Sequence, residues 1–276
     1  MPTMSLPHKP IESKTLNNLA ALAGQGAGTT ISSALIDLIE LGETVKQLSL
    51  EQISQPWLNQ AEQVILEKYQ FPKRRLEWLG GRICAKEVAR TRMTKNLATA
   101  PPLPTELRIK NQSSGRPVLE RDGHAPDSST LPELSISHSG RFAAAMASET
   151  CCGIDIQEIT PALERTRERF ALPQELLILQ HTWPTAGQLA QLGLLWSAKE
   201  ALKKSVGQES MPGFLELTLL TAQAQPGGLA LLTFKQHAKQ ESLRPLPFVA
   251  AGLLGQDYAL ALCTHSPTCD QADSHA

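Results

Sequence analysis

The sequence predicts an α+β fold built from two related halves, and two observations indicate it. A long helical pattern followed by short strand-like segments occupies residues 72–147, and a similar succession returns between residues 153 and 263. The composition, with 41% hydrophobic and 19% charged residues, is that of an ordinary soluble globular protein that can bury a sizeable core. The repeat lies in the architecture, since we find no clear sequence identity between the halves.

In the first half, the spacing of Leu76, Leu79 and Ile83 predicts a helix over residues 72–93. A proline-rich run at residues 100–104 cannot continue that helix. Strand-like segments follow at residues 107–110, 117–119, 134–137 and 142–147, and the last two are joined by a predicted hairpin turn.

The second half begins with an apolar strand at residues 153–156, followed by a charged helical stretch at residues 163–170. A second long helix is predicted over residues 186–206. Strand signals then close the half at residues 215–220, 229–234, 248–253 and 258–263.

We therefore expect four parts along the chain. They are a partly flexible N-terminal extension at residues 1–45, two halves at residues 46–149 and 150–264, and a flexible tail at residues 265–276. The extension is assigned because it mixes small and polar residues without strong periodicity, and the tail because it is polar.

Net charge, cysteine content and the distribution of apolar residues indicate which partners and which compartment to expect. A net charge of −1 gives no general attraction to nucleic acid or to an anionic membrane, so neither partner is expected and any anion site must be local. The five cysteines lack zinc-site spacing and are expected to be free thiols, which fits a reducing cytoplasm. No apolar run approaches the roughly 20 residues of a membrane helix, and no secretory signal is apparent, so we expect a cytoplasmic protein.

Two carboxylates are candidates for chemistry. Asp155 stands between two isoleucines in a strand, so it faces away from both of them. Glu200 lies in the second long helix with Lys204 one turn later. The ordinary interpretation is that Asp155 faces solvent and that Glu200 forms a surface ion pair with Lys204. The functional interpretation is that both carboxylates lie at a site for a metal ion and a phosphate.

Several basic groups are candidates for binding an anion. Ser137 and His138 end a strand before a small-residue turn, which offers backbone N–H groups and an imidazole donor. Arg74 and Arg82 lie on one face near the start of a helix, where cations oppose the helix dipole unless an anion is bound. Arg116 lies on a rigid Gly-Arg-Pro turn suited to a bidentate contact. Taken singly, each of these residues also has a purely structural interpretation. His138 is then a hydrogen-bonded residue of the hairpin, and the arginines belong to a solvated basic face.

Taken together, these motifs resemble those of the 4′-phosphopantetheinyl transferases of the Sfp type. The resemblance covers residues 72–207 and continues towards residue 263. It rests on five ordered motifs: Gly81-Arg82 in an arginine-rich helix, Gly115-Arg116-Pro117, Ser137-His138-Ser139-Gly140, Gly153-Ile154-Asp155, and Trp196-Ser197-Ala198-Lys199-Glu200-Ala201 followed by Lys204. It implies two pseudo-two-fold related halves, each a long helix packed on a small antiparallel sheet, with coenzyme A between them.

The resemblance implies holo-[acyl-carrier-protein] synthase activity. The 4′-phosphopantetheine arm of coenzyme A would pass to a serine of an apo acyl or peptidyl carrier protein, which presents that serine at a helix start in an acidic context. Mg²⁺ would be held by Asp155 and Glu200, Glu200 would also take the proton of the serine, and Lys204 would neutralise charge on the leaving phosphate. The coenzyme A site would comprise Arg74, Arg82, Arg116, Ser137, His138, Asp155 and Lys204. Because one chain would form the whole cleft, a monomer would suffice.

One position departs from the family pattern. Many members carry a second carboxylate two residues after the aspartate, where this chain has Gln157 followed by Glu158. An amide oxygen still coordinates Mg²⁺, directly or through water, without adding negative charge. We therefore expect Gln157 to be a weaker third metal ligand, while Glu158 faces the other side of the strand.

Two other functions are compatible with these motifs. One is a binding module for coenzyme A or a carrier protein that has lost catalysis, for which Gln157 would be the sign. The other, from a different class, is a metal-dependent phosphohydrolase acting on a nucleotide, which would need an activated water instead of a protein serine.

The metal assignment predicts how three alanine variants behave. Asp155→Ala and Glu200→Ala each abolish transfer because each removes a charged ligand, whereas Gln157→Ala lowers it only mildly because it removes a neutral one. Steady-state rates of carrier modification at saturating Mg²⁺ measure this. Wild-type turnover by Asp155→Ala would contradict the metal assignment.

Overall fold

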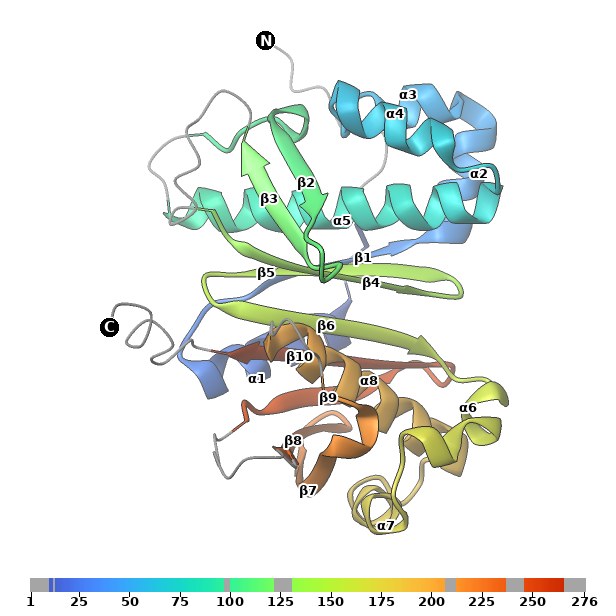
Figure 1. Cartoon of the computed structure of the whole chain (residues 1–276), viewed down its shortest axis with the longest axis vertical. Coiled ribbons are helices and arrows are strands. Elements are labelled where there is room, and N and C mark those ends of the chain that lie inside the picture. The colour runs from blue at the N-terminus through green and yellow to red at the C-terminus, as the bar shows by residue number, and fades with distance from the viewer. Residues whose placement is uncertain are drawn as a thin grey trace.

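Two antiparallel sheets, each covered by one long helix, form the centre of the structure (Figure 1). The computed structural model describes residues 10–11, 13–96, 100–121, 131–206, 212–236 and 246–265. Within that part of the chain, the predicted α+β class with two similar halves is confirmed. No helix among these residues is both long and apolar enough to cross a membrane.

The N-terminal half places helix α5 on a three-stranded sheet with the order β1-β5-β4, beside a two-stranded β2-β3 ribbon. Its core lies between α5 and the sheet, where Leu79, Ile83 and Ala143 are fully buried. The elements are β1 (Ser32–Asp37), α2 (Leu38–Leu48), α3 (Leu50–Ser54), α4 (Gln60–Lys68), α5 (Pro72–Asn96), η1 (Pro104–Glu106), β2 (Leu107–Asn111), β3 (Pro117–Arg121), β4 (Glu133–Ser139) and β5 (Phe142–Ser148).

The C-terminal half places helix α8 on a five-stranded sheet with the order β6-β10-β9-β8-β7. Its elements are β6 (Cys151–Glu158), α6 (Ala162–Arg165), η3 (Arg167–Arg169), α7 (Pro173–Thr182), α8 (Gln188–Val206), η4 (Phe214–Glu216), β7 (Leu217–Gln225), β8 (Leu229–Gln236), β9 (Val249–Leu254) and β10 (Tyr258–His265). The order of elements from β1 to β5 in the first half is thus repeated from β6 to β10 in the second.

A buried ion pair anchors each long helix in the same way. On α8, Lys199 is fully buried and donates to the carbonyls of Phe170 (2.7 Å) and Phe214 (3.1 Å) and to Glu175 (2.8 Å). The same oxygen of Glu175, Oε1, also accepts a hydrogen bond from the backbone N–H of Leu219 at 2.8 Å. All hydrogen-bonding groups of this buried charge are therefore occupied, as a buried lysine requires.

The N-terminal half repeats this arrangement with other residues. Lys86 of α5 is also fully buried and donates to Glu62 and to the carbonyls of Trp57 (2.7 Å) and Pro104 (3.0 Å). Glu62 in turn accepts from the N–H of Ile109 at 3.1 Å. The two lysines stand in the same three-residue sequence, Ala-Lys-Glu, at residues 85–87 and 198–200. The two halves thus share this three-residue sequence at their buried lysines.

Residues of the expected N-terminal extension are part of both halves. Strand β1 forms the edge of the N-terminal sheet and pairs with β5 over its whole length. Helix α1 (Lys14–Ala27) buries Leu16, Leu19 and Ala23 against β9 and β10. The last turns of this helix contain Gly24 and Gly26, and Gly28 follows it, which explains why the helix gave a weak signal in the sequence. Of the expected flexible ends, residues 1–9 and 266–276 lie outside the described residues.

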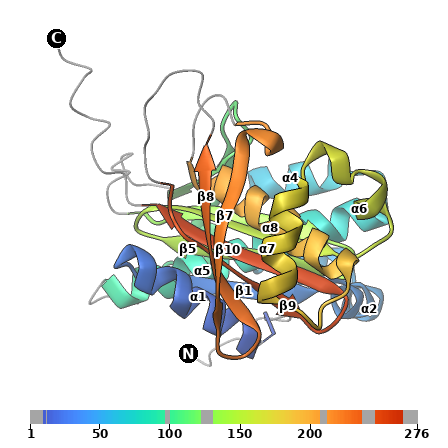
Figure 2. The ribbon, with the colours of Figure 1, turned by 90° about the horizontal axis from the view of Figure 1, so that it is seen from below.

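Helices α1 and α8 lie on opposite faces of the C-terminal sheet, as the view from below shows (Figure 2). Along β10, Leu260 and Leu262 face α1, whereas Ala259, Ala261 and Cys263 face α8. This alternation gives the strand two buried faces. The face that carries Leu260 and Leu262 also packs against apolar residues of the N-terminal half. The two halves therefore share an apolar interface, which α1 extends.

Three serine hydroxyls join the two sheets where β4 lies beside β6. Ser135, Ser137 and Ser139 accept hydrogen bonds from the backbone N–H groups of Ile154 (3.0 Å), Ile156 (3.3 Å) and Glu158 (3.0 Å), respectively. The two strands run in the same direction, and the serines take the role that backbone carbonyls have in a sheet. We call these three residues the serine ladder. It fixes the position of β6 relative to β4 and therefore that of one half relative to the other.

The glycine of the Gly-Ile-Asp motif allows α8 to approach β6 closely. A Cβ atom on Gly153 would lie 1.9 Å from the carbonyl oxygen of Ala201. No real side chain accepts that distance, so this position requires glycine. The close approach places the last turns of α8 directly over Asp155.

Gly153→Ala is expected to lower the free energy of unfolding by about 1–3 kcal/mol, because the added methyl group pushes α8 away from β6. Gly187→Ala is the matched control, since nothing lies within 4 Å of a Cβ at that position. Urea unfolding of both variants measures the difference. Equal stabilities of the two variants would contradict the close contact.

Candidate functional site

Asp155 and Lys204 meet where the last turns of α8 cross β6. The Lys204 ammonium donates to Asp155 Oδ1 at 2.7 Å and to the carbonyl of Ile154 at 3.0 Å. The Ser137 hydroxyl donates to the same carboxylate oxygen at 2.8 Å. Asp155 is only 5% exposed, so the interpretation as a solvent-facing aspartate is excluded.

The other oxygen of Asp155 has no partner. Oδ2 is buried and accepts no hydrogen bond from any residue that the structure describes. A buried charged oxygen without a donor is costly unless a ligand binds it. Asp155 therefore has one oxygen that is hydrogen-bonded within the protein and one that accepts no hydrogen bond from the described residues.

Glu200 lies one helical turn before Lys204, but the two do not form the surface pair that the spacing allowed. Glu200 Oε1 lies 3.5 Å from the ammonium of Lys203, while Lys204 is directed to Asp155. Lys203 also lies 4.1 Å from the centre of the Phe214 ring, in a cation–π contact. The Glu200 side chain stays 24% exposed, so its carboxylate remains accessible.

Three of the predicted anion-binding residues line one cavity, which lies in the N-terminal half of the structure. Arg74, Arg82 and His138 surround a volume of about 230 Å³. Arg74 Nη1 lies 3.4 Å from His138 Nε2, and Glu77 lies 3.1 Å from Arg74 and 3.8 Å from His138. The other lining residues are Tyr69, Trp78, Gly81, Asn111, Gly115, Pro117 and Ile136. We call this volume the cation-lined cavity.

Arg82 is held at the wall of this cavity by the helix that carries it. Its guanidinium lies 4.7 Å from the centre of the Trp78 ring, one turn earlier on α5, and its Nε lies 3.8 Å from Glu62. The side chain is 9% exposed. An arginine held by stacking and by one distant carboxylate is preorganised to bind an anion.

Three other predicted site residues are engaged elsewhere. Arg116 pairs with Glu133 at 2.8 Å, at the start of β4 and five residues before His138. The Ser137 hydroxyl is occupied by Asp155 and by the N–H of Ile156, so it lies beneath the site and not in the cavity. Gln157 donates from its amide to the carbonyl of Glu158 at 2.8 Å. The structure therefore does not bring these three groups to the cavity, and their contacts with a ligand stay predictions.

Glu158 faces away from Asp155, as strand alternation predicted. Its carboxylate accepts a hydrogen bond from the Tyr258 hydroxyl at 3.3 Å, and that hydroxyl accepts one from the N–H of Arg141 at 2.9 Å. This contact ties the β4–β5 turn to the C-terminal half, next to the serine ladder. Sequence reasoning missed Tyr258, since nothing local indicates the partner of an isolated tyrosine.

The cavity wall also contains groups that sequence reasoning missed. Glu77 and Trp78 lie on the same helix as Arg74 and Arg82, and their helical spacing to these arginines was a usable signal. Tyr69 and Asn111 come from a loop and a strand end, for which the sequence gave no signal.

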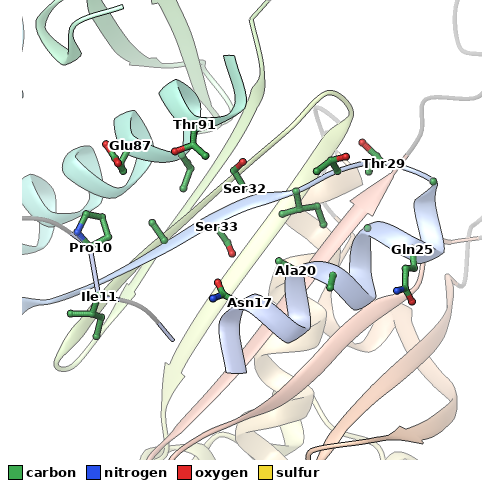
Figure 3. Close-up of a pocket in the computed structure, with 17 residues that line it drawn as sticks. Pro10, Ile11, Asn17, Ala20, Gln25, Thr29, Ser32, Ser33, Glu87 and Thr91 are labelled. Atoms are coloured by element: carbon green, nitrogen blue, oxygen red, sulfur yellow. The ribbon is translucent and has the colours of Figure 1, made fainter. Parts of the chain in front are cut away.

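A cavity of about 880 Å³ lies on another side of the molecule, between α1, β1 and α5 (Figure 3). Its lining includes Ser32 and Ser33 of β1 and Glu87 and Thr91 of α5, but no lysine or arginine that the structure describes. A site without cations does not suit a phosphate group. The cation-lined cavity is therefore the better candidate for a phosphorylated ligand, although it is smaller.

The described residues include no group of three or more histidine, cysteine, aspartate or glutamate side chains placed to hold a metal ion. Mg²⁺ is often held by only one or two carboxylates, with water and substrate phosphates completing its shell. The buried Oδ2 of Asp155 is an oxygen donor of the kind that Mg²⁺ accepts.

Burial lowers the pKa of His138 below the ordinary value of 6.5, with smaller opposing effects of Glu77 and Asp155. The unfolded chain then binds this proton more tightly than the folded chain, so the free energy of unfolding falls as the pH falls through 6.5.

We expect the ring protons of His138 to titrate below pH 6.5 in NMR spectra, and His138→Gln to lose less stability than the wild type as the pH is lowered from 6.5. The variant also identifies the resonance by its disappearance. A midpoint at or above pH 6.5 would contradict the burial of the neutral ring.

Comparisons with known proteins agree with the motifs. Residues 151–263 match the model of the 4′-phosphopantetheinyl transferase superfamily. A curated relative, the 4′-phosphopantetheinyl transferase psf-1 of Bacillus pumilus, is 30% identical over 168 residues, which are 60% of this chain and 64% of the relative. The chain thus spans less than two thirds of that relative's length.

Solved structures of similar proteins were also found. Holo-ACP-synthase from Plasmodium yoelii matches with a TM-score of 0.36 and 19% identity, over 43% of this chain and 91% of that chain. The Chronobacterium ammoniagenes ACPS–CoA complex matches with a TM-score of 0.34 and 22% identity, over 44% of this chain and 95% of that chain. Over residues 151–263, this chain is therefore similar to the 4′-phosphopantetheinyl transferase superfamily.

Proposed function

We propose that this protein transfers the 4′-phosphopantetheine arm of coenzyme A to a serine of an apo acyl or peptidyl carrier protein. The observation that carries the proposal is the free, buried Oδ2 of Asp155, held beside Lys204 and next to a cavity lined by two arginines and a histidine. The family match of residues 151–263 supports the same reaction.

The cation-lined cavity holds phosphates of coenzyme A. Arg74 and Arg82 supply fixed positive charge, and His138 supplies a neutral ring that gains a proton when a phosphate binds nearby. Glu77 neutralises part of this charge in the absence of ligand. Binding of the cofactor therefore requires Arg74 to exchange its contact with Glu77 for one with a phosphate oxygen.

Asp155 fits a magnesium ion because it keeps one buried carboxylate oxygen free. Glu200, and Gln157 after rotation of its amide, would complete the protein ligands. The ion would offset the negative charge of the pyrophosphate, which otherwise repels an attacking hydroxyl. Ser137 orients Asp155 for this role by its hydrogen bond to Oδ1.

The protein's own side chains handle the proton and the leaving group. The serine oxygen of the carrier bonds to the phosphorus next to the pantetheine, and the bond from that phosphorus to the bridging oxygen breaks. Adenosine 3′,5′-bisphosphate leaves with the electron pair of that bond. Glu200 accepts the serine proton, and the ammonium of Lys204 stabilises charge on the departing phosphate.

We further propose that the enzyme acts in the cytoplasm as a monomer. Cys84, Cys152 and Cys263 are buried free thiols, which persist in a reducing compartment, and burial raises the pKa of Cys263 to about 12. Asp155 and His138 come from different halves of the same chain, so the proposed site needs no second subunit.

The proposed reaction predicts a defined product. Incubation with coenzyme A, Mg²⁺ and an apo carrier protein is expected to add one phosphopantetheine group to the carrier, seen by intact-protein mass spectrometry. The carrier with its target serine replaced by alanine is the control and should gain no mass.

Two results would contradict the proposal. Binding of coenzyme A without any mass increment, over a panel of acyl and peptidyl carriers, would indicate a binding module. Breakdown of coenzyme A at the same rate with and without carrier would indicate a phosphohydrolase.

A further inference from the structure

Among the described residues that line the cation-lined cavity, Glu77 is the one carboxylate. Its side chain is only 11% exposed, and it lies on α5 between Arg74 and Arg82. A negative charge in this position repels a phosphate group and so lowers the affinity of the cavity for one. The protein therefore keeps, in a cavity lined by cations, a group that opposes the binding of anions.

Glu77 already contacts two of the groups that are suited to bind a phosphate oxygen. Its Oε2 lies 3.1 Å from Arg74 Nη1 and 3.8 Å from His138 Nδ1. Arg74 and His138 are themselves 3.4 Å apart, so one carboxylate lies against both of them. Glu77 thus takes the place beside these side chains that a bound anion would otherwise fill.

Arg82 differs from Arg74 in how closely its carboxylate partner holds it. The Arg82 side chain is 9% exposed, and its buried Nε donates no hydrogen bond to any residue that the structure describes. Its partner Glu62, at 3.8 Å, is already paired with the fully buried Lys86. Arg82 is therefore ready to donate to a phosphate, whereas Arg74 first has to leave Glu77.

A second cation lies close enough to receive Glu77 when Arg74 moves. Lys73 Nζ lies 4.0 Å from Oε1, the other oxygen of Glu77, and the lysine side chain is 78% exposed. Because Lys73 lies one turn before Glu77 on the same helix, its ammonium is free to approach the carboxylate. The displaced carboxylate is therefore not left without a counter-charge, which would make the exchange too costly.

We propose that Glu77 is an internal counter-anion that weakens the binding of phosphorylated ligands and thereby speeds the release of adenosine 3′,5′-bisphosphate. This inference rests on the function proposed above. When a phosphate binds, Arg74 turns to it and Glu77 moves to Lys73. When the bisphosphate leaves, Glu77 returns to Arg74 and His138 and replaces the contact that is lost. Release of product limits the turnover of many enzymes, so a site that holds phosphates less tightly gains turnover.

Glu77→Gln tests the proposal because it removes the charge and keeps the shape of the side chain. The variant is expected to bind adenosine 3′,5′-bisphosphate and coenzyme A about tenfold more tightly, since the repulsion is gone and Arg74 has no competing carboxylate. Isothermal titration calorimetry measures both affinities. The dissociation rate of the bisphosphate, measured by surface plasmon resonance on the immobilised protein, is expected to fall by a similar factor.

Glu164→Gln is the matched control. Glu164 pairs with Arg167 at 2.9 Å across the same spacing of three residues, but it lies on α6, outside the cavity. Its affinities for both ligands are expected to equal those of the wild type. Should Glu77→Gln fail to fold, as judged by circular dichroism, Glu77→Ala takes its place, with the same expected direction.

The sign of the change decides between a counter-anion and a positioning role. A lower affinity of Glu77→Gln would contradict the proposal, because Glu77 would then position Arg74 and His138 for the ligand. An unchanged affinity, or an equal increase in Glu164→Gln, would contradict it as well.

The binding measurements need no carrier protein, so they are separate from the test of the proposed function. If Glu77→Gln binds more tightly and the wild type modifies no carrier, the proposed function fails and the counter-anion role in binding stands. If the wild type modifies the carrier and Glu77→Gln binds no more tightly, the counter-anion role is wrong and the function stands. A wild type that binds neither ligand would contradict both.

Discussion

The structure depends on the serine ladder between β4 and β6, and above all on Ser137. Its hydroxyl accepts from the N–H of Ile156, which joins the two halves, and donates to Asp155, which orients the carboxylate. One hydroxyl has one proton to donate and two lone pairs to accept, so both contacts are compatible. Through this residue, the strand that carries His138 in one half lies beside the strand that carries Asp155 in the other.

Each half is itself built around a buried lysine–glutamate pair. Comparison of the two long helices, α5 and α8, explains why the chain has one proposed site. Breaking such a pair leaves an uncompensated buried charge, so the pairs fix each long helix against its sheet. Glu87 of α5 follows its buried lysine as Glu200 follows Lys199 on α8. One turn further, however, Thr91 stands where the second helix has Lys204. The first helix therefore lacks the cation that meets Asp155.

Local patterns predicted much of the fold and part of the site. Strand alternation placed Asp155 away from its neighbouring isoleucines, and helical spacing placed Arg74 and Arg82 on one wall. The contacts that decide the site are not local. Lys204 pairs with Asp155, and not with Glu200 as the helical spacing also allowed, because the fold offers Lys204 a buried carboxylate. Similarly, Arg116 turns to Glu133, and the role of Ser137 depends on which strand lies beside it.

The central claim is that Asp155, Lys204 and the cation-lined cavity form one site for a metal and a pyrophosphate. A crystal structure with coenzyme A and Mg²⁺ tests it most directly. The account predicts the ion on Oδ2 of Asp155, at about 2.0–2.1 Å, with phosphates of the cofactor on Arg74, Arg82 and His138. Coenzyme A bound in the 880 Å³ cavity between α1 and α5, or an ion without Asp155 among its ligands, would contradict it.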